Sequence, residues 1–299
     1  MENQLLIKSS AFRASFTATV FLSLSSHSFA QSVFAFQGLY AGNSGAFTSI
    51  DGNGTPNNGS NPFVTSRDFT GMDSHGIQQT MTISGSAWSN ASYGKIHVHG
   101  QGTITNPYYN SANSPYFDGT LDPNGSPDLL AINGNAGFTD SFTYTGLTGS
   151  GYKVNFYFRL EGTVSGDVES GLNFSTSDPA GQSFNPRTHV GNELWITPYY
   201  QVDWNQPLAI SADFYAGLNT KVSQHAEGLS YSASADYGNT LELAGMVVVD
   251  ANGTEVTGWT MSSASGTNYP TGAVPEPSSV LGVALGLGFI IRRRKMKQL

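Results

Sequence analysis

The segment from Tyr152 to Val164 constrains the fold of this chain more than any other stretch. Its even positions are apolar or aromatic apart from Gly162, and its odd positions carry hydroxyl, amide or charged groups. Successive side chains of a β-strand point to opposite faces, so this alternation predicts a strand with one face on a core and the other in water. Half-buried strands of this kind are typical of antiparallel sheets.

The surrounding sequence, from residue 31 to residue 261, has the same character. The chain contains 35 glycines and only 11% charged residues, which suits strands joined by turns and is poor for helix. Residues 42–62, rich in Gly, Asn and Ser, are expected to form a long loop. Further strands are expected at residues 95–105, 194–201, 208–214 and 229–235, with a closing hairpin over 241–261 around an Asn252-Gly253 turn. We therefore predict an all-β ectodomain, an antiparallel β-sandwich or jelly roll.

Residues 1–30 have the features of a secretory signal peptide. Lys8 and Arg13 supply a basic region, an apolar region follows, and Ser28-Phe29-Ala30 offers a small-x-small cleavage site. The chain has no cysteine, which excludes disulfides and thiolate chemistry.

The sequence after the ectodomain divides into a linker and a tail. Residues 262–273 are rich in Ser, Gly and Thr and are expected to be a linker. The tail, residues 274–299, contains Pro275-Glu276-Pro277, an apolar run over 280–291 and a basic cluster over 292–297 that includes Arg292, Arg293, Arg294 and Lys295. The run is shorter than the roughly 20 residues of a typical membrane helix, but snorkelling arginine stems extend its reach. We predict a short transmembrane helix whose basic end stays on the cytoplasmic side.

This order of Pro-Glu-Pro, apolar helix and arginine cluster resembles the PEP-CTERM sorting signal of exported bacterial proteins. The resemblance covers about the last 25 residues. It implies that the membrane enzyme exosortase recognises Pro275, Glu276 and Pro277 and processes the protein at the inner membrane. It also implies a final location at the cell surface or in the extracellular matrix of a Gram-negative bacterium.

Charge argues against nucleic acid as a partner. The whole chain carries a net charge of −8, although many of its 13 basic residues lie in the two terminal segments. The ectodomain is therefore more acidic than the chain as a whole. Such a surface repels phosphate backbones.

Two motifs have the donor types of metal sites. Oxygen side chains at alternate positions, Asp122, Asn124, Ser126 and Asp128, resemble the start of a calcium loop, but Asx-type turns explain them equally. His97 and His99 are two residues apart on one predicted strand, so both rings face the same way and suit a transition metal. The alternative for this pair is two surface histidines on a polar strand face, and no cofactor follows from either motif alone.

Enzymatic and carbohydrate-binding functions have weaker support. A glycosidase needs two carboxylates about 5–10 Å apart, and no spacing selects a pair among the acids near strands. Exposed aromatic rings can stack on sugars, although most rings of a chain like this fill the core. The acids are Glu161, Asp167, Glu169, Glu193 and Asp203, and the aromatic residues are Tyr108, Tyr109, Tyr116, Phe117, Trp195, Tyr199, Tyr200 and Trp204.

These observations favour an exported, non-enzymatic structural or adhesive protein with exosortase as its processing partner. A module that binds exopolysaccharide is the alternative, and a secreted polysaccharide hydrolase is a third possibility.

Overall fold

The computed structural model describes most of the region between the two terminal segments. The signal segment, the tail and the Asp122–Asp128 motif lie outside the described residues. The described residues are 31–43, 46–55, 62–73, 75–108, 129–148, 150–202, 206–226 and 228–272.

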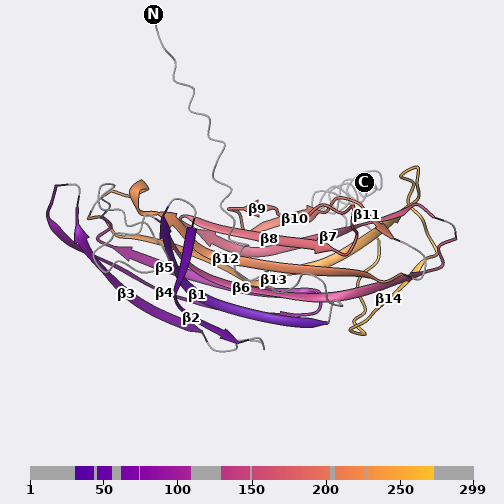
Figure 1. The fold of residues 1–299 in the computed structure, drawn as a ribbon, viewed down its shortest axis with the longest axis horizontal. Helices are drawn as coiled ribbons and strands as arrows, with labels where there is room; N and C mark the ends of the chain where they lie inside the picture. The colour runs from indigo at the N-terminus through magenta and orange to yellow at the C-terminus, as the bar shows by residue number, and fades with distance from the viewer. Residues whose placement is uncertain are drawn as a thin grey trace, which may run out of the picture.

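The described residues form two antiparallel sheets that pack face to face, which confirms the predicted all-β sandwich (Figure 1). The first sheet has seven strands: β1 (Ser32–Asn43), β2 (Ala46–Thr55), β6 (Leu129–Thr145), β8 (Val168–Thr176), β9 (Arg187–Thr188), β12 (Leu208–Lys221) and β14 (Thr260–Ser263). Their order is β2-β1-β6-β12-β8-β9, and β14 pairs with β6.

The second sheet also has seven strands. They are β3 (Phe63–Met72), β4 (Gln78–Ser92), β5 (Lys95–Thr105), β7 (Tyr152–Ser165), β10 (Asn192–Ile196), β11 (Tyr200–Val202) and β13 (Tyr231–Val249). Their order is β10-β7-β13-β5-β4-β3, and β11 pairs with β7. Among the described residues, the only helical turn is the 3-10 segment η2 (Val222–Gln224), and no helix is long and apolar enough to span a bilayer.

The predicted strand over residues 152–164 is β7, and its alternation is largely as expected. Val154, Phe156, Phe158 and Leu160 are buried, and Arg159 and Glu161 are exposed. Asn155 departs from the pattern, because it is buried although the alternation assigns it to the solvent face.

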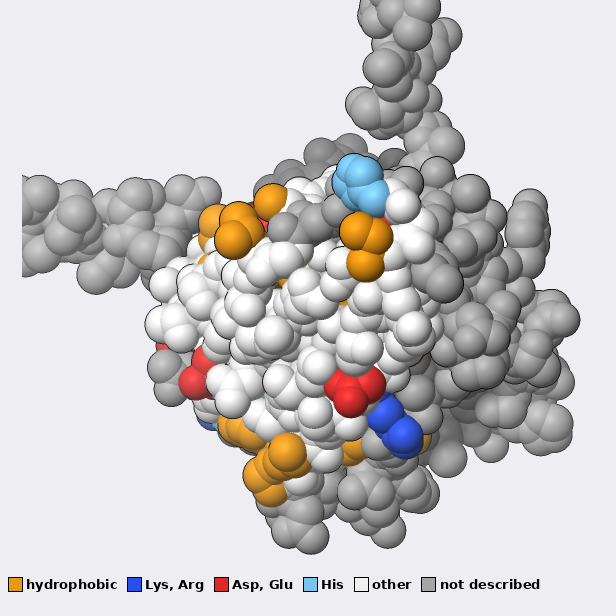
Figure 2. All heavy atoms as spheres, turned by 90° about the vertical axis from the view of Figure 1, so that its left-hand side faces the viewer, with side chains coloured by type: hydrophobic (Ala, Val, Ile, Leu, Met, Phe, Trp, Pro, Cys, Tyr) orange, Lys and Arg blue, Asp and Glu red, His pale blue; other side chains and the backbone are white. Residues whose placement is uncertain are grey.

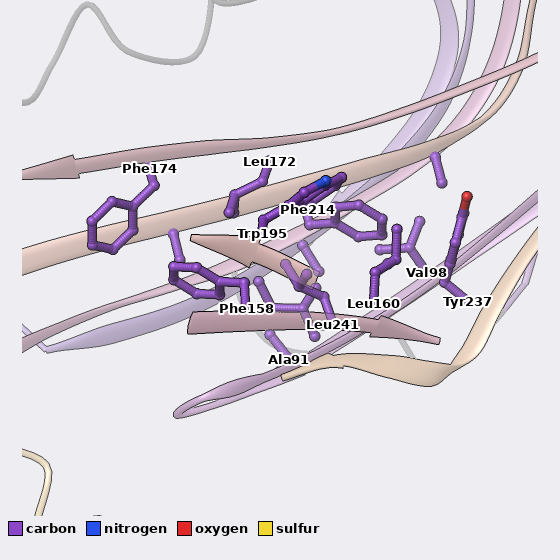
Figure 3. Packing of buried hydrophobic residues seen from close by; sticks show 14 of the residues in the cluster. Ala91, Val98, Phe158, Leu160, Leu172, Phe174, Trp195, Phe214, Tyr237 and Leu241 are labelled. Atoms are coloured by element: carbon purple, nitrogen blue, oxygen red, sulfur yellow. The ribbon is translucent and has the colours of Figure 1, made fainter. Parts of the chain in front are cut away.

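Aromatic side chains from both sheets join the two layers. Phe214 of β12 lies between Trp195 of β10, at 6.2 Å between ring centroids, and Tyr237 of β13, at 5.3 Å and nearly perpendicular (Figure 3). Offset and edge-on contacts of this kind add to the stabilisation from burial. The rings therefore fix how the first sheet sits on the second.

Glycines within strands let the two backbones approach closely. A Cβ on Gly100 of β5 would lie 2.7 Å from both the Ala216 carbonyl oxygen and the Gly217 Cα of the opposite sheet. A Cβ on Gly134 of β6 would lie 2.6 Å from the Trp88 carbonyl oxygen. Backbone atoms cannot move aside as a flexible side chain can, so these positions exclude any side chain.

Three expectations about chain segments differ from the structure. The expected loop over residues 42–62 contains strand β2, which pairs with β1 along its length. The expected strands at 229–235 and 241–249 are one strand, β13, with a register shift between Tyr237 and Leu241 where it pairs with β5. The expected closing hairpin forms around Asn252-Gly253, where Glu255 bridges Val249 and the Val256 N–H donates to the Val248 carbonyl. The end of its second arm then crosses over and pairs with β6 in the other sheet as β14.

The expected linker over residues 262–273 belongs to the folded domain as far as residue 272. We call residues 260–272 the C-terminal strap. Tyr269 is only 4% exposed and packs edge-on against Phe142 at 4.9 Å. The Gly272 N–H donates to the Met246 carbonyl at 2.8 Å. Ser and Gly are frequent here because the strap makes tight turns against the sheet, and its composition does not indicate a flexible spacer.

Candidate functional site

The clearest candidate site lies at one end of strands β8 and β12. A cavity of about 320 Å³ opens there, lined by Gly166, Asp167, Val168, Glu169, His189, Asn219, Thr220, Lys221 and Gln224. We call it the β8–β12 cleft. Its position follows from the alternation of β8, in which Val168, Leu172 and Phe174 are buried. Glu169 therefore points to the outer face of the first sheet.

Glu169 is held by two hydrogen bonds and an ion pair. Tyr215 Oη–H donates to Glu169 Oε1 at 2.5 Å, and Asn219 Nδ2 donates to Oε2 at 3.0 Å. The Arg187 Nε lies 3.5 Å from Oε1. Glu169 pairs with Gly217 across β12, so Tyr215 and Asn219 flank the position opposite it. A Cβ on Gly217 would clash with the Ile132 carbonyl oxygen of β6, so this position holds no side chain between the two donors.

The Arg187 guanidinium links Glu169 to a second acid. Its carbon lies 4.8 Å from the centre of the Tyr215 ring, and its Nη2 donates to Asn173 Oδ1 at 3.3 Å. Asn173 Nδ2 in turn donates to Asp213 Oδ2 at 3.3 Å. The outer face of the first sheet thus carries a connected polar network from the cleft to Asp213.

Burial perturbs two groups of this network. It raises the pKa of Asp213 to about 6, although the amides of Asn173 and Asn135 and the charge of Arg187 act in the opposite direction. Asp213 Oδ1 has no hydrogen-bond partner in the described part of the chain. Burial and the neighbouring Glu169 charge also raise the pKa of the Tyr215 hydroxyl.

A second chain of hydrogen bonds forms the rim of the cleft. Thr220 Oγ1–H donates to Asp167 Oδ2 at 3.2 Å, and His225 Nε2 lies 2.7 Å from the same hydroxyl oxygen. The His225 ring stacks on Tyr231 at 4.0 Å, and the Tyr231 hydroxyl contacts the Asp167 backbone N–H. His189 Nδ1 lies 2.5 Å from the Val168 carbonyl, so Nδ1 is the donor of this hydrogen bond.

The structure brings two of the five predicted acids together. Asp167 and Glu169 both line the β8–β12 cleft. Glu161 and Glu193 lie on β7 and β10 of the other sheet, and Asp203 lies outside the described residues. Asp213, Arg187 and Tyr215 were not singled out from the sequence. The one signal for Asp213 is a carboxylate placed in the otherwise apolar stretch of β12.

His97 and His99 do lie on one face of β5, as predicted, but each has a partner of another kind. His97 Nδ1 lies 2.8 Å from the Gly238 carbonyl. The His99 ring stacks on Trp88 at 6.3 Å, and its Nδ1 lies 3.7 Å from Asp236. Within the described ranges, no group of three or more His, Asp or Glu side chains is arranged to hold a metal ion.

Most of the described candidate aromatic residues belong to the core. Trp195, Tyr200 and Tyr108 are buried, whereas Tyr199 is 50% exposed. The remaining candidates, Tyr109, Tyr116, Phe117 and Trp204, lie outside the described residues. On the face drawn in Figure 2, the described side chains are mainly neutral and polar, with scattered charged and apolar groups.

Comparison with protein families identifies the end of the chain. Residues 273–295 match the model of the PEP-CTERM protein-sorting motif, and the match begins directly after Gly272, the last described residue. No curated protein matched the chain in a sequence comparison. The motif is the recognition signal of exosortase and indicates export and membrane-associated processing. The chain is therefore a protein with a PEP-CTERM sorting signal, carried by residues 273–295.

Proposed function

We propose that exosortase processes this protein at the inner membrane and that its β-sandwich then acts as a structural or adhesive module. Its place would be the cell surface or the extracellular matrix of a Gram-negative bacterium. The observation that carries the proposal is the sorting motif at residues 273–295, whose match begins directly after Gly272, the last described residue of the sandwich.

The polar groups of the cleft support a non-enzymatic role. Glu169 is occupied by Tyr215, Asn219 and Arg187, and Asp167 accepts from Thr220. These bonds tie the two acids to the sandwich. Covalent catalysis uses a nucleophile whose proton goes to a general base. The Thr220 hydroxyl lies beside His225 but donates to Asp167, and the hydrogen bonds of Glu169 come from hydroxyl and amide donors.

Calcium at Asp122, Asn124, Ser126 and Asp128 stays a prediction, as does a transition metal at His97 and His99. Neither is needed for the proposed role.

Replacing Pro275, Glu276 and Pro277 together by alanine tests the processing step. We expect the variant to remain in the inner membrane with its tail uncleaved, since the recognition element is gone. Cell fractionation and the intact mass of the protein from each fraction measure this. Pro270→Ala is the matched control, because Pro270 is an exposed strap proline outside the motif. Unchanged release of the triple variant, or equal release from a host strain lacking exosortase, would contradict the proposal.

A further inference from the structure

The β8–β12 cleft combines hydrogen-bond acceptors and donors in one small space. Asp167 and Glu169 offer acceptors, and Lys221 offers donors. Asn219, Thr220 and Gln224 add groups that do both. The cavity volume, about 320 Å³, lies at the lower end of the range of small-molecule sites, roughly 300–1,000 Å³. Its size and chemistry suit a compact polar ligand.

Glu169 is rigid and still has capacity to bind. An ionised carboxylate has about four acceptor positions; Tyr215 and Asn219 occupy two of them, and Arg187 forms an ion pair with Oε1 at 3.5 Å. Its side chain is 33% exposed. A ligand hydroxyl can therefore donate to Glu169 without displacing a protein donor, and the carboxylate loses little side-chain freedom on binding because it is already held.

The charges of the cleft select among polar ligands. The carboxylates of Asp167 and Glu169 are balanced by the ammonium of Lys221 and by the Arg187 guanidinium, which lies 3.5 Å from Glu169 Oε1, so the cleft offers an anionic ligand no net attraction. A metal ion is disfavoured, because no set of three His, Asp or Glu ligands is assembled in the described part of the chain. Hydroxyl groups, which both donate and accept, match the mixed lining best.

We propose that the β8–β12 cleft binds a short segment of a neutral polysaccharide through its hydroxyl groups. The inference rests on the proposed function in one respect, since export places the cleft where polysaccharide occurs. Among the described residues, none of the aromatic residues considered from the sequence lines the cleft. Recognition here is by hydrogen bonds to Glu169, Asp167 and Asn219, and requires no exposed ring.

Isothermal titration calorimetry of the purified exported protein tests this proposal. The neutral probes are maltotetraose, cellotetraose and mannotetraose, and tetragalacturonate is the anionic comparison. We expect at least one neutral probe to bind and tetragalacturonate to bind at least about tenfold more weakly. Glu169→Gln should lower the affinity for the neutral probe by about tenfold or more, because it replaces a charged acceptor by a neutral one.

Two further variants separate loss of binding from loss of folding. Asp167→Asn changes a rim carboxylate that is 53% exposed, so we expect a folded protein with weaker binding. Glu255→Gln changes an exposed carboxylate away from the cleft and should bind as the unaltered protein does. The proposal is overturned if no neutral probe binds at up to about 10 mM, or if Glu169→Gln and Asp167→Asn both bind normally. Because binding is measured without exosortase, a failure to bind is distinct from a failure of export or processing.

Discussion

Asp213 lowers the stability of the protein at neutral pH, and replacing it by asparagine should raise that stability. The carboxylate is 5% exposed and has one oxygen without a hydrogen-bond partner in the described residues. Burial raises its pKa from 3.8 to about 6. The folded state therefore binds the Asp213 proton more tightly than the unfolded state does, and stability falls as the pH rises between these two values.

The size of the effect follows from the shift. One pKa unit corresponds to about 1.4 kcal/mol, so ionised Asp213 costs about 3 kcal/mol above pH 6, and the cost vanishes well below pH 3.8. Asparagine is neutral at every pH, keeps an acceptor for Asn173 and adds a donor near Asn135, whose Oδ1 is also unpartnered in the described residues. We expect Asp213→Asn to increase the free energy of unfolding by about 2–3 kcal/mol at neutral pH.

Urea unfolding followed by tryptophan fluorescence measures this at two pH values. The advantage of Asp213→Asn should shrink by about 2 kcal/mol between about pH 7.5 and about pH 4.5. Asp68→Asn, at an exposed carboxylate of β3, is the matched control and should show little change at either pH. If Asp213→Asn destabilises the protein equally at both pH values, the carboxylate is a net stabilising group and the reasoning fails.

Two predictions concern the packing of the sandwich. Asp140→Ala should lower the free energy of unfolding, measured by urea titration, by about 3–5 kcal/mol, because the Ser265 and Tyr269 donors lose a buried charged acceptor. A loss below about 1 kcal/mol would show that these hydrogen bonds contribute little to stability. Gly100→Ala should cost about 1–3 kcal/mol or more and lower the melting temperature, because the added methyl meets backbone of the other sheet. Ser92→Thr, which adds a methyl at an exposed position of β4, is its control, and equal melting of these two variants would contradict the close approach.

The alternation of side chains predicted much of the sandwich. Residues 152–164 and 95–105 became β7 and β5 with their apolar faces buried, because each strand meets a core on one side only. The same rule fails where both faces are covered. Strand β12 is buried along nearly all of its length, so its pattern gives no sign of which face is which.

Glycine-rich segments are a poor guide to loops in this chain. The run rich in Gly and Asn over residues 42–62 predicts a loop, but strand β2 lies there. Gly100 and Gly134 sit in strands because the opposite backbone leaves no room for a Cβ. Local composition does not separate a glycine that turns the chain from one that lets two sheets touch, since only the packed partner distinguishes them.

The candidate site was predictable only in part for a related reason. Asp167 and Glu169 were chosen as acids near strands, but no pair could be selected among the five. Their donors come from β12 and β9, and the register that places Tyr215 and Asn219 beside Glu169 is a property of strand pairing. Arg187 reaches the same site through its pairing with Gly171 on β8.

The C-terminal strap determines how much chain lies between the sandwich and the sorting motif. Asp140 Oδ2 accepts from Ser265 Oγ at 2.5 Å and from the Tyr269 hydroxyl at 2.7 Å, both charge-assisted bonds, and the Tyr269 ring is buried. Beyond Tyr269, the Gly272–Met246 backbone hydrogen bond is much weaker, at about 0.5–1.5 kcal/mol net. The Asp140 hydrogen bonds therefore anchor the strap at Ser265 and Tyr269 more firmly than the single backbone hydrogen bond anchors Gly272. Only residues 270–272 therefore separate the anchor at Tyr269 from the sorting motif, whose match begins at residue 273.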